Sequence, residues 1–226
     1  MSSRPRQLAL ALDHAESYAR ENFLSGPGNE GPLQFIDSWP DWPANAVALV
    51  GPEGSGKTHL AMMWAAAAGA RVISAHALGE AELPSALATG ALVVEDTASG
   101  ADERALFHLL NLAREEGASL LFTARSAPAT WRVAIPDLAS RLRALPVITL
   151  QAPDDAMLRA VIVKLAADRQ LMLDESVVGY LLTRIERSFA AARAAVIALD
   201  NEALRQGRPA TRALAAEIFR GGVAGP

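Results

Sequence analysis

The sequence feature that most constrains the fold of this chain is a glycine-rich stretch at residues 51–58, GPEGSGKT. It matches in full the pattern G-x-x-x-x-G-K-[ST] of phosphate-binding loops. The apolar run 46–50 before it predicts a buried strand, and the alanine-rich run 58–68 after it predicts a helix. This strand–loop–helix context predicts a site for a nucleoside diphosphate or triphosphate, formed by Gly51, Pro52, Glu53, Gly54, Ser55, Gly56, Lys57 and Thr58.

Each part of the loop has a physical role in binding phosphate. Glycines allow the backbone to curl so that its N–H groups point at phosphate oxygens, and the positive end of the following helix adds to the attraction. Lys57 supplies a charge for the β and γ phosphates, and the Thr58 hydroxyl is suited to bind Mg²⁺. Because the chain contains only one other lysine, Lys164, a lysine at this position indicates function. The alternative is a glycine-rich turn that opens a helix and binds nothing.

The rest of the first 150 residues predicts strands that alternate with helices, the clearest helix being 103–114. This alternation predicts an α/β fold in which a parallel sheet of about five strands is doubly wound, with helices on both faces. Before the first strand, residues 25–32 have the composition of a loop and residues 34–38 predict a short helix. The remaining strands are predicted at 71–74, 91–95, 119–123 and 146–150.

Strand patterns stop after Leu150, and only helical patterns follow. We therefore expect an N-terminal peptide and entry segment at 1–44, a P-loop nucleotide-binding α/β domain at 45–152, and a small all-helical lid domain at 153–226. The helices of the lid are predicted at 154–169, 174–187, 189–206 and 211–220.

The predicted strand 91–95 ends in acids, Glu95 and then Asp96. A buried strand that ends in acids beside a phosphate loop can hold Mg²⁺ and polarise a water molecule. The first acid in this arrangement is usually Asp, so Glu95 leaves the metal geometry open. We expect Mg²⁺ to bind at Thr58 and Glu95, with Glu95 and Asp96 among the catalytic residues. Thr123, which closes the following strand, either orients a water near the γ-phosphate or caps the strand end.

Arginines beyond the loop are further candidates for contacts with phosphates. Arg141 lies far along the chain from the loop, where an arginine is suited to reach a neighbouring molecule's nucleotide and neutralise charge in the transition state. The alternative for Arg141 is a surface arginine. Arg187 and Arg193, on the helices after the sheet, could contact phosphates, although a solvated or ion-paired arginine is the simpler interpretation of each.

Composition excludes several classes of function. The chain has no cysteine, which rules out disulfides and thiolate zinc sites and fits a reducing cytoplasm. No apolar stretch approaches the length of about 18 residues that a membrane span needs. The net charge of −4 argues against a chain whose main task is to grip a nucleic-acid backbone.

The N-terminal stretch 7–12, QLALAL, has alternating leucines that could dock in an apolar groove as an extended peptide. The alternative is the first turn of a helix that continues into Asp13 and His14.

Several of these segments resemble one family. The loop continuing as GKTHL at 56–60, the acid-ended strand, FHLLN at 107–111 and DLASRL at 137–142 are similar to the AAA+ module of the bacterial replication initiator DnaA. The resemblance is closer to the short DnaA-related regulators of the Hda family, the regulatory inactivators of DnaA, and it covers residues 7–219. Because the matched loop motif includes His59, we add His59 to the predicted nucleotide-binding residues. Arg193, a candidate phosphate contact on the helices after the sheet, is included with them.

The resemblance implies partners and an activity. In this family an N-terminal Gln-Leu peptide binds the sliding clamp of DNA polymerase III, and Gln7, Leu8 and Leu10 stand at its position. The arginine finger of the family falls on Arg141. The family joins a DNA-loaded clamp and stimulates ATP hydrolysis by DnaA. The initiator thereby returns to its inactive ADP form, which inhibits extra rounds of replication.

Differences from DnaA favour the regulator over the initiator. The sequence stops after the helical segment, and only residues 60–91 separate the loop from the acidic strand, where the initiator has inserted helices. We therefore expect no sequence-specific DNA binding. The lid arginine of the family falls on Ala190, and Arg193, on the same helix face, is placed to substitute for it. We expect bound ADP or ATP with Mg²⁺ and weak intrinsic ATPase activity at most.

Other classes of function stay open at this point. A stand-alone P-loop ATPase, such as a motor or a kinase-like enzyme, would hydrolyse ATP substantially by itself. A DnaA-like accessory binding module that uses nucleotide only for stability would show no effect of Arg141 on a partner. The sequence also leaves open whether ADP or ATP is the working ligand and whether the chain forms a homo-oligomer.

Overall fold

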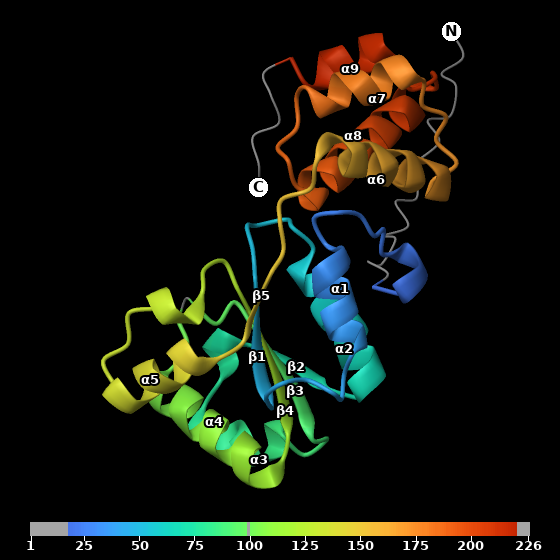
Figure 1. Cartoon of the computed structure of the whole chain (residues 1–226). Helices are drawn as coiled ribbons and strands as arrows, with labels where there is room; N and C mark the ends of the chain where they lie inside the picture. The colour runs from blue at the N-terminus through green and yellow to red at the C-terminus, as the bar shows by residue number, and fades with distance from the viewer. Residues whose placement is uncertain (1–17, 99, 221–226) are drawn as a thin grey trace, which may run out of the picture. The chain divides into compact units, whose positions relative to one another are not determined.

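The computed structural model describes residues 18–98 and 100–220. The chain divides into two compact units, an α/β unit, Tyr18–Pro153, and a helical unit that begins at Asp154 (Figure 1). Within the described residues, no helix combines the length and apolar character that a membrane crossing requires.

The α/β unit is built on a parallel sheet of five strands in the order β2-β3-β4-β1-β5. This topology confirms the predicted α/β class. Since all strands are parallel, their carboxyl ends meet at one edge, which places the loop after β1 next to the end of β4, with the end of β3 one strand further along. The strands are β1 (Ala46–Val50), β2 (Arg71–Ser74), β3 (Ala91–Glu95), β4 (Ser119–Ala124) and β5 (Val147–Thr149).

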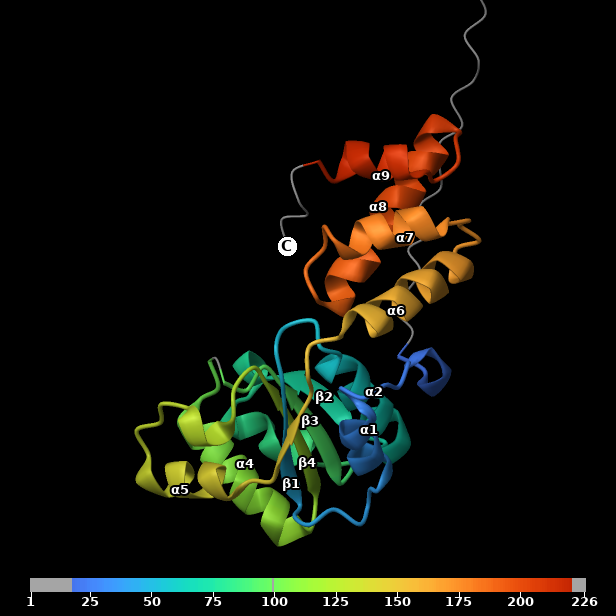
Figure 2. The same ribbon diagram turned by 45° about the horizontal axis from the view of Figure 1, so that its top comes forward.

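Helices cover both faces of the sheet (Figures 1 and 2). Successive residues of a strand point to opposite faces. Val47 and Leu49 of β1 therefore join one apolar core, and Ala48 and Val50 join the other. Because both faces of β1 are covered, the strand is apolar and buried along its whole length. The first core is closed by α1 (Glu30–Asp37) and α2 (Lys57–Ala68), and the second by α3 (Leu83–Ala86), α4 (Glu103–Glu116) and α5 (Pro136–Ala144).

Helix α1 begins earlier than the predicted helix 34–38 and occupies the end of the predicted loop 25–32. Pro32 lies in the first turn of α1, where the missing N–H of proline costs no hydrogen bond. Asn29, at the N-cap, is buried, and its side-chain amide forms hydrogen bonds of 2.8 and 2.9 Å within the preceding turn. Leu33 is buried against the sheet. The glycines and proline of this stretch therefore shape a helix start rather than a longer loop.

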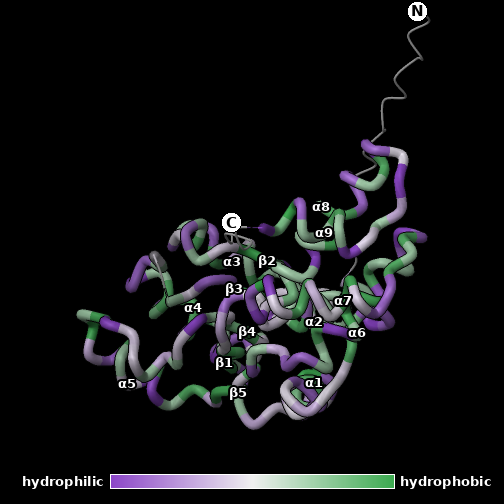
Figure 3. Tube along the Cα trace, turned by 90° about the horizontal axis from the view of Figure 1, so that it is seen from above, coloured by the Kyte–Doolittle hydropathy of each residue, from purple (hydrophilic) through white to green (hydrophobic). Residues whose placement is uncertain are grey.

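The helical unit packs its helices around an apolar core of its own. Figure 3 shows hydrophobic and hydrophilic residues alternating along these helices, as expected for helices with one buried side. The side chains of Asp154, Ser188 and Thr211 each accept a backbone N–H at a helix start, which accounts for three of the boundaries. The helices are α6 (Asp155–Asp168), α7 (Glu175–Leu182), α8 (Phe189–Gln206) and α9 (Arg212–Ile218).

Helix α7 ends at Leu182 and is therefore shorter than the predicted helix 174–187. The Thr183 hydroxyl donates to the carbonyl oxygen of Tyr180 at 2.8 Å, a local bond that competes with continuation of the helix. Ser188 then caps α8. The residues between the two helices form a short turn.

Candidate nucleotide-binding site

The start of the phosphate loop is held at the carboxyl edge of the sheet by its neighbours. Gly51 follows β1, and its backbone N–H donates to the carbonyl oxygen of Ala124, the last residue of β4, at 3.1 Å. A Cβ atom at Gly51 would lie 2.6 Å from the carbonyl oxygen of Leu150 and 2.9 Å from Ser55 Oγ. No side chain fits at this position unless the backbone moves, so the fold requires glycine here.

The loop ends by turning directly into α2. Gly56, the N-cap, has a φ of 94°, in the left-handed region that glycine adopts at no steric cost. The first backbone N–H groups of α2 have no acceptor inside the helix and carry its positive end. Ser55 is 1% exposed, and its Oγ has no hydrogen-bond partner among the described residues. A buried polar atom of this kind, beside amides that lack helical acceptors, fits a phosphate group.

Lys57, the first residue of α2, is folded back onto the loop. Its Nζ donates to the carbonyl oxygens of Gly51 at 2.9 Å and Pro52 at 2.8 Å, and the residue is 9% exposed. An ammonium group forms stronger hydrogen bonds with charged phosphate oxygens than with neutral carbonyls. Lys57 is therefore placed to exchange these carbonyls for phosphate when a nucleotide binds.

The pKa of Lys57 reports on its surroundings. Burial lowers this pKa below its ordinary value of 10.5. Charged neighbours act on it as well: the carboxylates of Asp96, Glu53 and Glu95 raise the pKa, and the guanidinium of Arg125 lowers it. All four charges therefore lie within electrostatic range of the ammonium group at the mouth of the loop.

The residues predicted to bind Mg²⁺ come from α2 and β3. Thr58 is exposed on the first turn of α2, and Glu95 is half-buried at the end of β3. Mg²⁺ at such sites takes one or two protein oxygens and completes its shell with phosphate and water. Within the described ranges, no group of three or more His, Asp or Glu side chains gathers into a metal site. Mg²⁺ binding by Thr58 and Glu95 stays a prediction.

Thr123 is buried at the end of β4 and contacts the turn that carries the second acid. Its Oγ1 accepts the backbone N–H of Asp96 at 3.1 Å, and its carbonyl oxygen accepts the N–H of Thr97 at 2.9 Å. Asp96 has a φ of 56°, a left-handed conformation that needs such support in a residue other than glycine. Thr123 therefore contacts Asp96 directly. The predicted role of Thr123 in orienting a water molecule stays a prediction.

An ion pair between Arg125 and Glu53 lies at the loop, and the sequence analysis did not identify it. Nη2 of Arg125 lies 2.6 Å from Oε2 of Glu53. Arg125 follows the last residue of β4, and Glu53 is the third residue of the loop. The pair depends on β4 lying next to β1, a neighbour relation that local sequence does not encode.

His59 contacts an aromatic segment that precedes α1. The rings of Tyr18 and Phe23 meet the His59 ring edge-on, with centroids 5.5 and 5.2 Å away, and Nε2 lies 3.3 Å from the carbonyl oxygen of Ala19. Residues 18–23 therefore lie against the first turn of α2, beside the loop. No sequence pattern predicts this contact, because the first 44 residues show little regular pattern.

Arg141 lies on α5 and contacts α4. Its Cζ is 5.1 Å from the centroid of the Phe107 ring, within the range of a cation–π interaction. The Glu103 carboxylate, at the start of α4, accepts the backbone N–H groups of Ala134 and Ile135 at 2.9 to 3.1 Å, just before α5 begins. Helix α4 therefore fixes both the start of α5 and the direction of Arg141.

The remaining predicted residues belong to the helical unit or lie outside the described residues. Ala190 and Arg193 are in the first turns of α8, and Arg187 precedes α8 and pairs with Asp155 at 3.1 Å. These residues belong to the helical unit, and contacts of Arg193 with phosphate stay a prediction. The predicted clamp-binding residues Gln7, Leu8 and Leu10 lie outside the described residues.

Comparison with known proteins identifies a relative among replication initiators. No family model matches the sequence. The chromosomal replication initiator protein DnaA 2 of Chlamydia caviae is 26% identical to this chain over 191 residues. The match covers 71% of this chain and 41% of the initiator, so the chain spans less than half the length of this relative.

Solved structures of DnaA share the architecture. Domain III of the Thermotoga maritima replication initiation protein DnaA matches with a TM-score of 0.76 at 20% identity, over 92% of this chain and 98% of that chain. AMPPCP-bound DnaA from Aquifex aeolicus matches with a TM-score of 0.63 at 20% identity, over 79% of this chain and 63% of that chain. At these identities the matches establish the fold and not the activity. The parallel five-stranded sheet with its flanking helices therefore has the AAA+ P-loop fold of DnaA domain III.

Proposed function

We propose that this chain is a nucleotide-bound regulator of DNA replication initiation, which acts with the DNA-loaded sliding clamp to stimulate ATP hydrolysis by the initiator DnaA. The observation that carries the proposal is the loop itself, where the Lys57 ammonium, the unpaired Ser55 hydroxyl and the start of α2 converge. Similarity in sequence to DnaA 2 and in fold to DnaA domain III supports a role in replication.

Nucleotide binding is the first part of this proposal. Lys57 releases the carbonyls of Gly51 and Pro52 and binds the β and γ phosphates, together with the first amides of α2. Thr58 and Glu95 hold Mg²⁺, which neutralises phosphate charge. The bound AMPPCP in the DnaA structure from Aquifex aeolicus supports an adenine nucleotide as the ligand.

Action on a partner's nucleotide is the second part. Arg141 contacts α4 through Phe107, and this stacking holds the guanidinium in one direction. An arginine supplied from a neighbouring molecule stabilises the charge that develops on a γ-phosphoryl group in the transition state. Arg141 thereby supplies this positive charge to the nucleotide that DnaA binds.

Recruitment to the clamp is the third part. Gln7, Leu8 and Leu10 bind an apolar groove of the clamp as an extended peptide. Binding to the clamp brings the chain to replicated DNA without sequence-specific DNA binding of its own. The net charge of −4 fits a protein that reaches DNA through a partner.

The test measures phosphate release from ATP-loaded DnaA in the presence of clamp loaded on DNA. Wild type should accelerate release, and the double variant Gln7→Ala, Leu10→Ala should not, while its ADP affinity stays unchanged. Removing one buried leucine from a groove costs about 2 kcal/mol or more, which is over roughly tenfold in affinity. Absence of stimulation by the wild type contradicts the proposal. Fast hydrolysis by this chain alone would support the stand-alone ATPase instead.

A further inference from the structure

Two arginines of the helical unit, Arg184 and Arg212, differ from most of its basic residues in what they contact. Six other basic side chains of this unit pair with carboxylates, for example Arg205 with Glu202. In the part of the chain that the structure describes, neither Arg184 nor Arg212 forms an ion pair with a carboxylate. Their charges are therefore not compensated by a fixed acidic partner.

Both arginines contact the same aromatic ring, that of Tyr180. The Cζ atom of Arg184 lies 5.4 Å from the ring centroid, and that of Arg212 lies 5.9 Å from it. Distances in this range give cation–π attraction. Tyr180 lies on α7, Arg184 follows the end of α7, and Arg212 is the first residue of α9. The ring thus brings together charges from two segments that are distant in the sequence and packed side by side (Figure 1).

Local hydrogen bonds fix the backbone next to both arginines. After α7, the Thr183 hydroxyl donates to the carbonyl oxygen of Tyr180 at 2.8 Å. At the start of α9, Oγ1 of Thr211 accepts the N–H of Leu214 at 3.4 Å. The Tyr180 ring is half-buried, whereas both arginines are exposed. Because backbone and ring together orient the two guanidinium groups, the charges are presented to solvent at one defined place.

Two guanidinium groups at one ring suit an anion. Positive charges held close together raise the local potential and attract negative groups. A guanidinium binds phosphate oxygens in a bidentate manner through its planar N–H groups. The groups already lie over the Tyr180 ring, so the site offers charge rather than a stacking surface. Contacts of this kind bind a nucleic-acid backbone without reading its sequence.

The phosphodiester backbone of DNA fits both the spacing and the charge. One strand presents a phosphate about every 3.4 Å of helix axis. The two distances from the ring limit the guanidinium groups to a separation of about 11 Å, so together they reach more than one phosphate. Residues 154–220 contain ten Lys and Arg against nine Asp and Glu, although the whole chain has a net charge of −4. The excess negative charge of the chain therefore lies outside this range.

We propose that Arg184 and Arg212, oriented by Tyr180, form a sequence-independent contact with the phosphodiester backbone of duplex DNA. The choice of DNA rests in part on the proposed function, which brings the chain to a DNA-loaded clamp. The contact adds to recruitment by the clamp and holds the helical unit against the adjacent duplex. Since the net charge of −4 opposes DNA binding by the chain as a whole, the contact is weak and acts where DNA is already close.

Fluorescence anisotropy of labelled duplex DNA tests the inference, with the full chain titrated at several salt concentrations in the absence of clamp and DnaA. Wild type should bind duplexes of different sequence equally well at low salt. Arg184→Gln, Arg212→Gln keeps most of each aliphatic stem and removes both charges. This double variant should bind DNA about tenfold or more weakly than wild type. Its plot of log affinity against log salt should be shallower by about 2.

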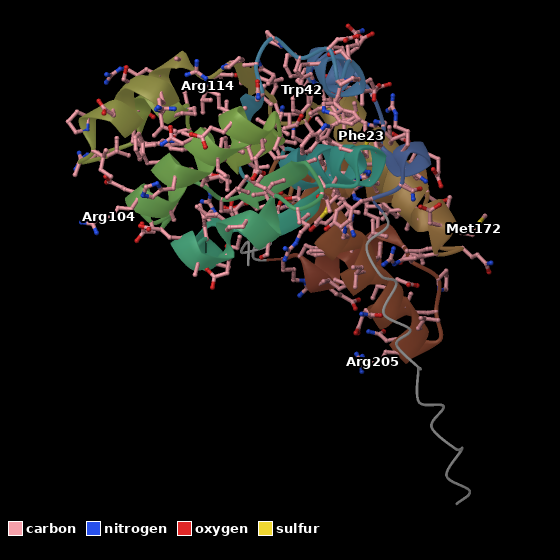
Figure 4. The ribbon with its side chains drawn as sticks, turned by 90° about the horizontal axis from the view of Figure 1, so that it is seen from below. Phe23, Trp42, Arg104, Arg114, Met172 and Arg205 are labelled. Atoms are coloured by element: carbon pink, nitrogen blue, oxygen red, sulfur yellow. The ribbon has the colours of Figure 1, made fainter. Side chains whose placement is uncertain are left out.

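The matched control is Arg159→Gln, Arg205→Gln, which removes two charges of the same unit that are already paired with carboxylates. Figure 4 shows Arg205 at the surface of the helical unit. This control should bind DNA within about twofold of wild type, because paired and screened charges contribute little. Tyr180→Phe retains the ring and should bind as wild type does, whereas Tyr180→Leu removes the ring and should bind more weakly.

Equal loss of DNA affinity in the control and in Arg184→Gln, Arg212→Gln overturns the inference, since it assigns the effect to net charge. Unchanged DNA binding in that variant, with stimulation of DnaA lost, also overturns it and assigns the two arginines to an acidic protein partner. A wild type that stimulates DnaA but binds no duplex at low salt overturns the inference and leaves the proposed function in place. A wild type that binds duplex through these arginines but does not stimulate DnaA contradicts the proposed function alone.

Discussion

The guanidinium of Arg141 lies over the ring of Phe107, with Cζ 5.1 Å from the ring centroid. The contact joins α5 to α4, and one turn earlier on α4 the Glu103 carboxylate binds the backbone just before α5. Helix α4 therefore determines where α5 presents its arginine. The prediction that separates a regulator from an enzyme depends on this arginine.

Arg141→Ala should retain its own nucleotide and its clamp binding but fail to accelerate ATP hydrolysis by DnaA. Loss of an arginine finger in comparable systems reduces the rate by about 10³- to 10⁵-fold. The measurement is phosphate release from ATP-loaded DnaA with clamp and DNA present. Arg143→Ala, an exposed arginine on the same helix, is the control and should behave as wild type. Full stimulation by Arg141→Ala would falsify the finger role.

Glu103→Ala should lower the free energy of unfolding by about 1 to 2 kcal/mol, because the N–H groups of Ala134 and Ile135 lose a charged acceptor at a partly exposed site. Urea denaturation measures this change. Glu115→Ala, near the other end of α4, is the control and should stay within about 0.5 kcal/mol of wild type. A Glu103 variant as stable as the control would mean that this carboxylate does not fix the start of α5.

Thr123→Val should expose the backbone amide of Asp96 to exchange. The substitution conserves shape but removes the Oγ1 that accepts this N–H, and an unsatisfied amide of this kind costs about 1 to 3 kcal/mol. Hydrogen–deuterium exchange should be faster at residues 96–97 in Thr123→Val than in Thr123→Ser, which retains the hydroxyl. Equal protection in both variants would show that the turn is held by other contacts.

The affinity for ADP should fall as the pH rises through the alkaline range below 10.5. Burial lowers the pKa of Lys57 in the free protein, whereas bound phosphate favours the ammonium form. Binding therefore takes up a proton, and affinity is full below the free-state pKa and is lost as the pH rises through it. Lys57→Arg keeps its charge over this range. A decline of the same size in Lys57→Arg would assign the pH dependence to another group.

The fold could be predicted in large part because its signals are local. The runs that form β1, β2 and β3 are short and have apolar centres, and the strands occur at the predicted positions. Helix α5 was not among the predicted helices, although Pro136 at its first position and Leu138 and Leu142 one turn apart are a signal for it. Its many polar residues weaken that signal.

The candidate site could be predicted only where its residues are contiguous. The loop is a continuous motif, so its geometry follows from local glycines and the start of α2. The pairing of Arg125 with Glu53 and the packing of Phe23 on His59 join segments that only the tertiary fold brings together. Strand order and the path of the chain before α1 determine these contacts, and neither has a local sequence pattern.

Calorimetric titration of Lys57→Ala with ADP decides whether residues 51–58 form the nucleotide site. The Lys57 ammonium contacts loop carbonyls, so the variant should lose at most the contribution of these two hydrogen bonds and stay folded. The matched control is Lys164→Ala, which removes the other lysine of the chain, paired with Asp168 on α6. Wild type and control should bind ADP, and binding should be weaker by about 100-fold or more in Lys57→Ala. Unchanged affinity in a folded Lys57→Ala variant would contradict the assignment of this loop as the nucleotide site.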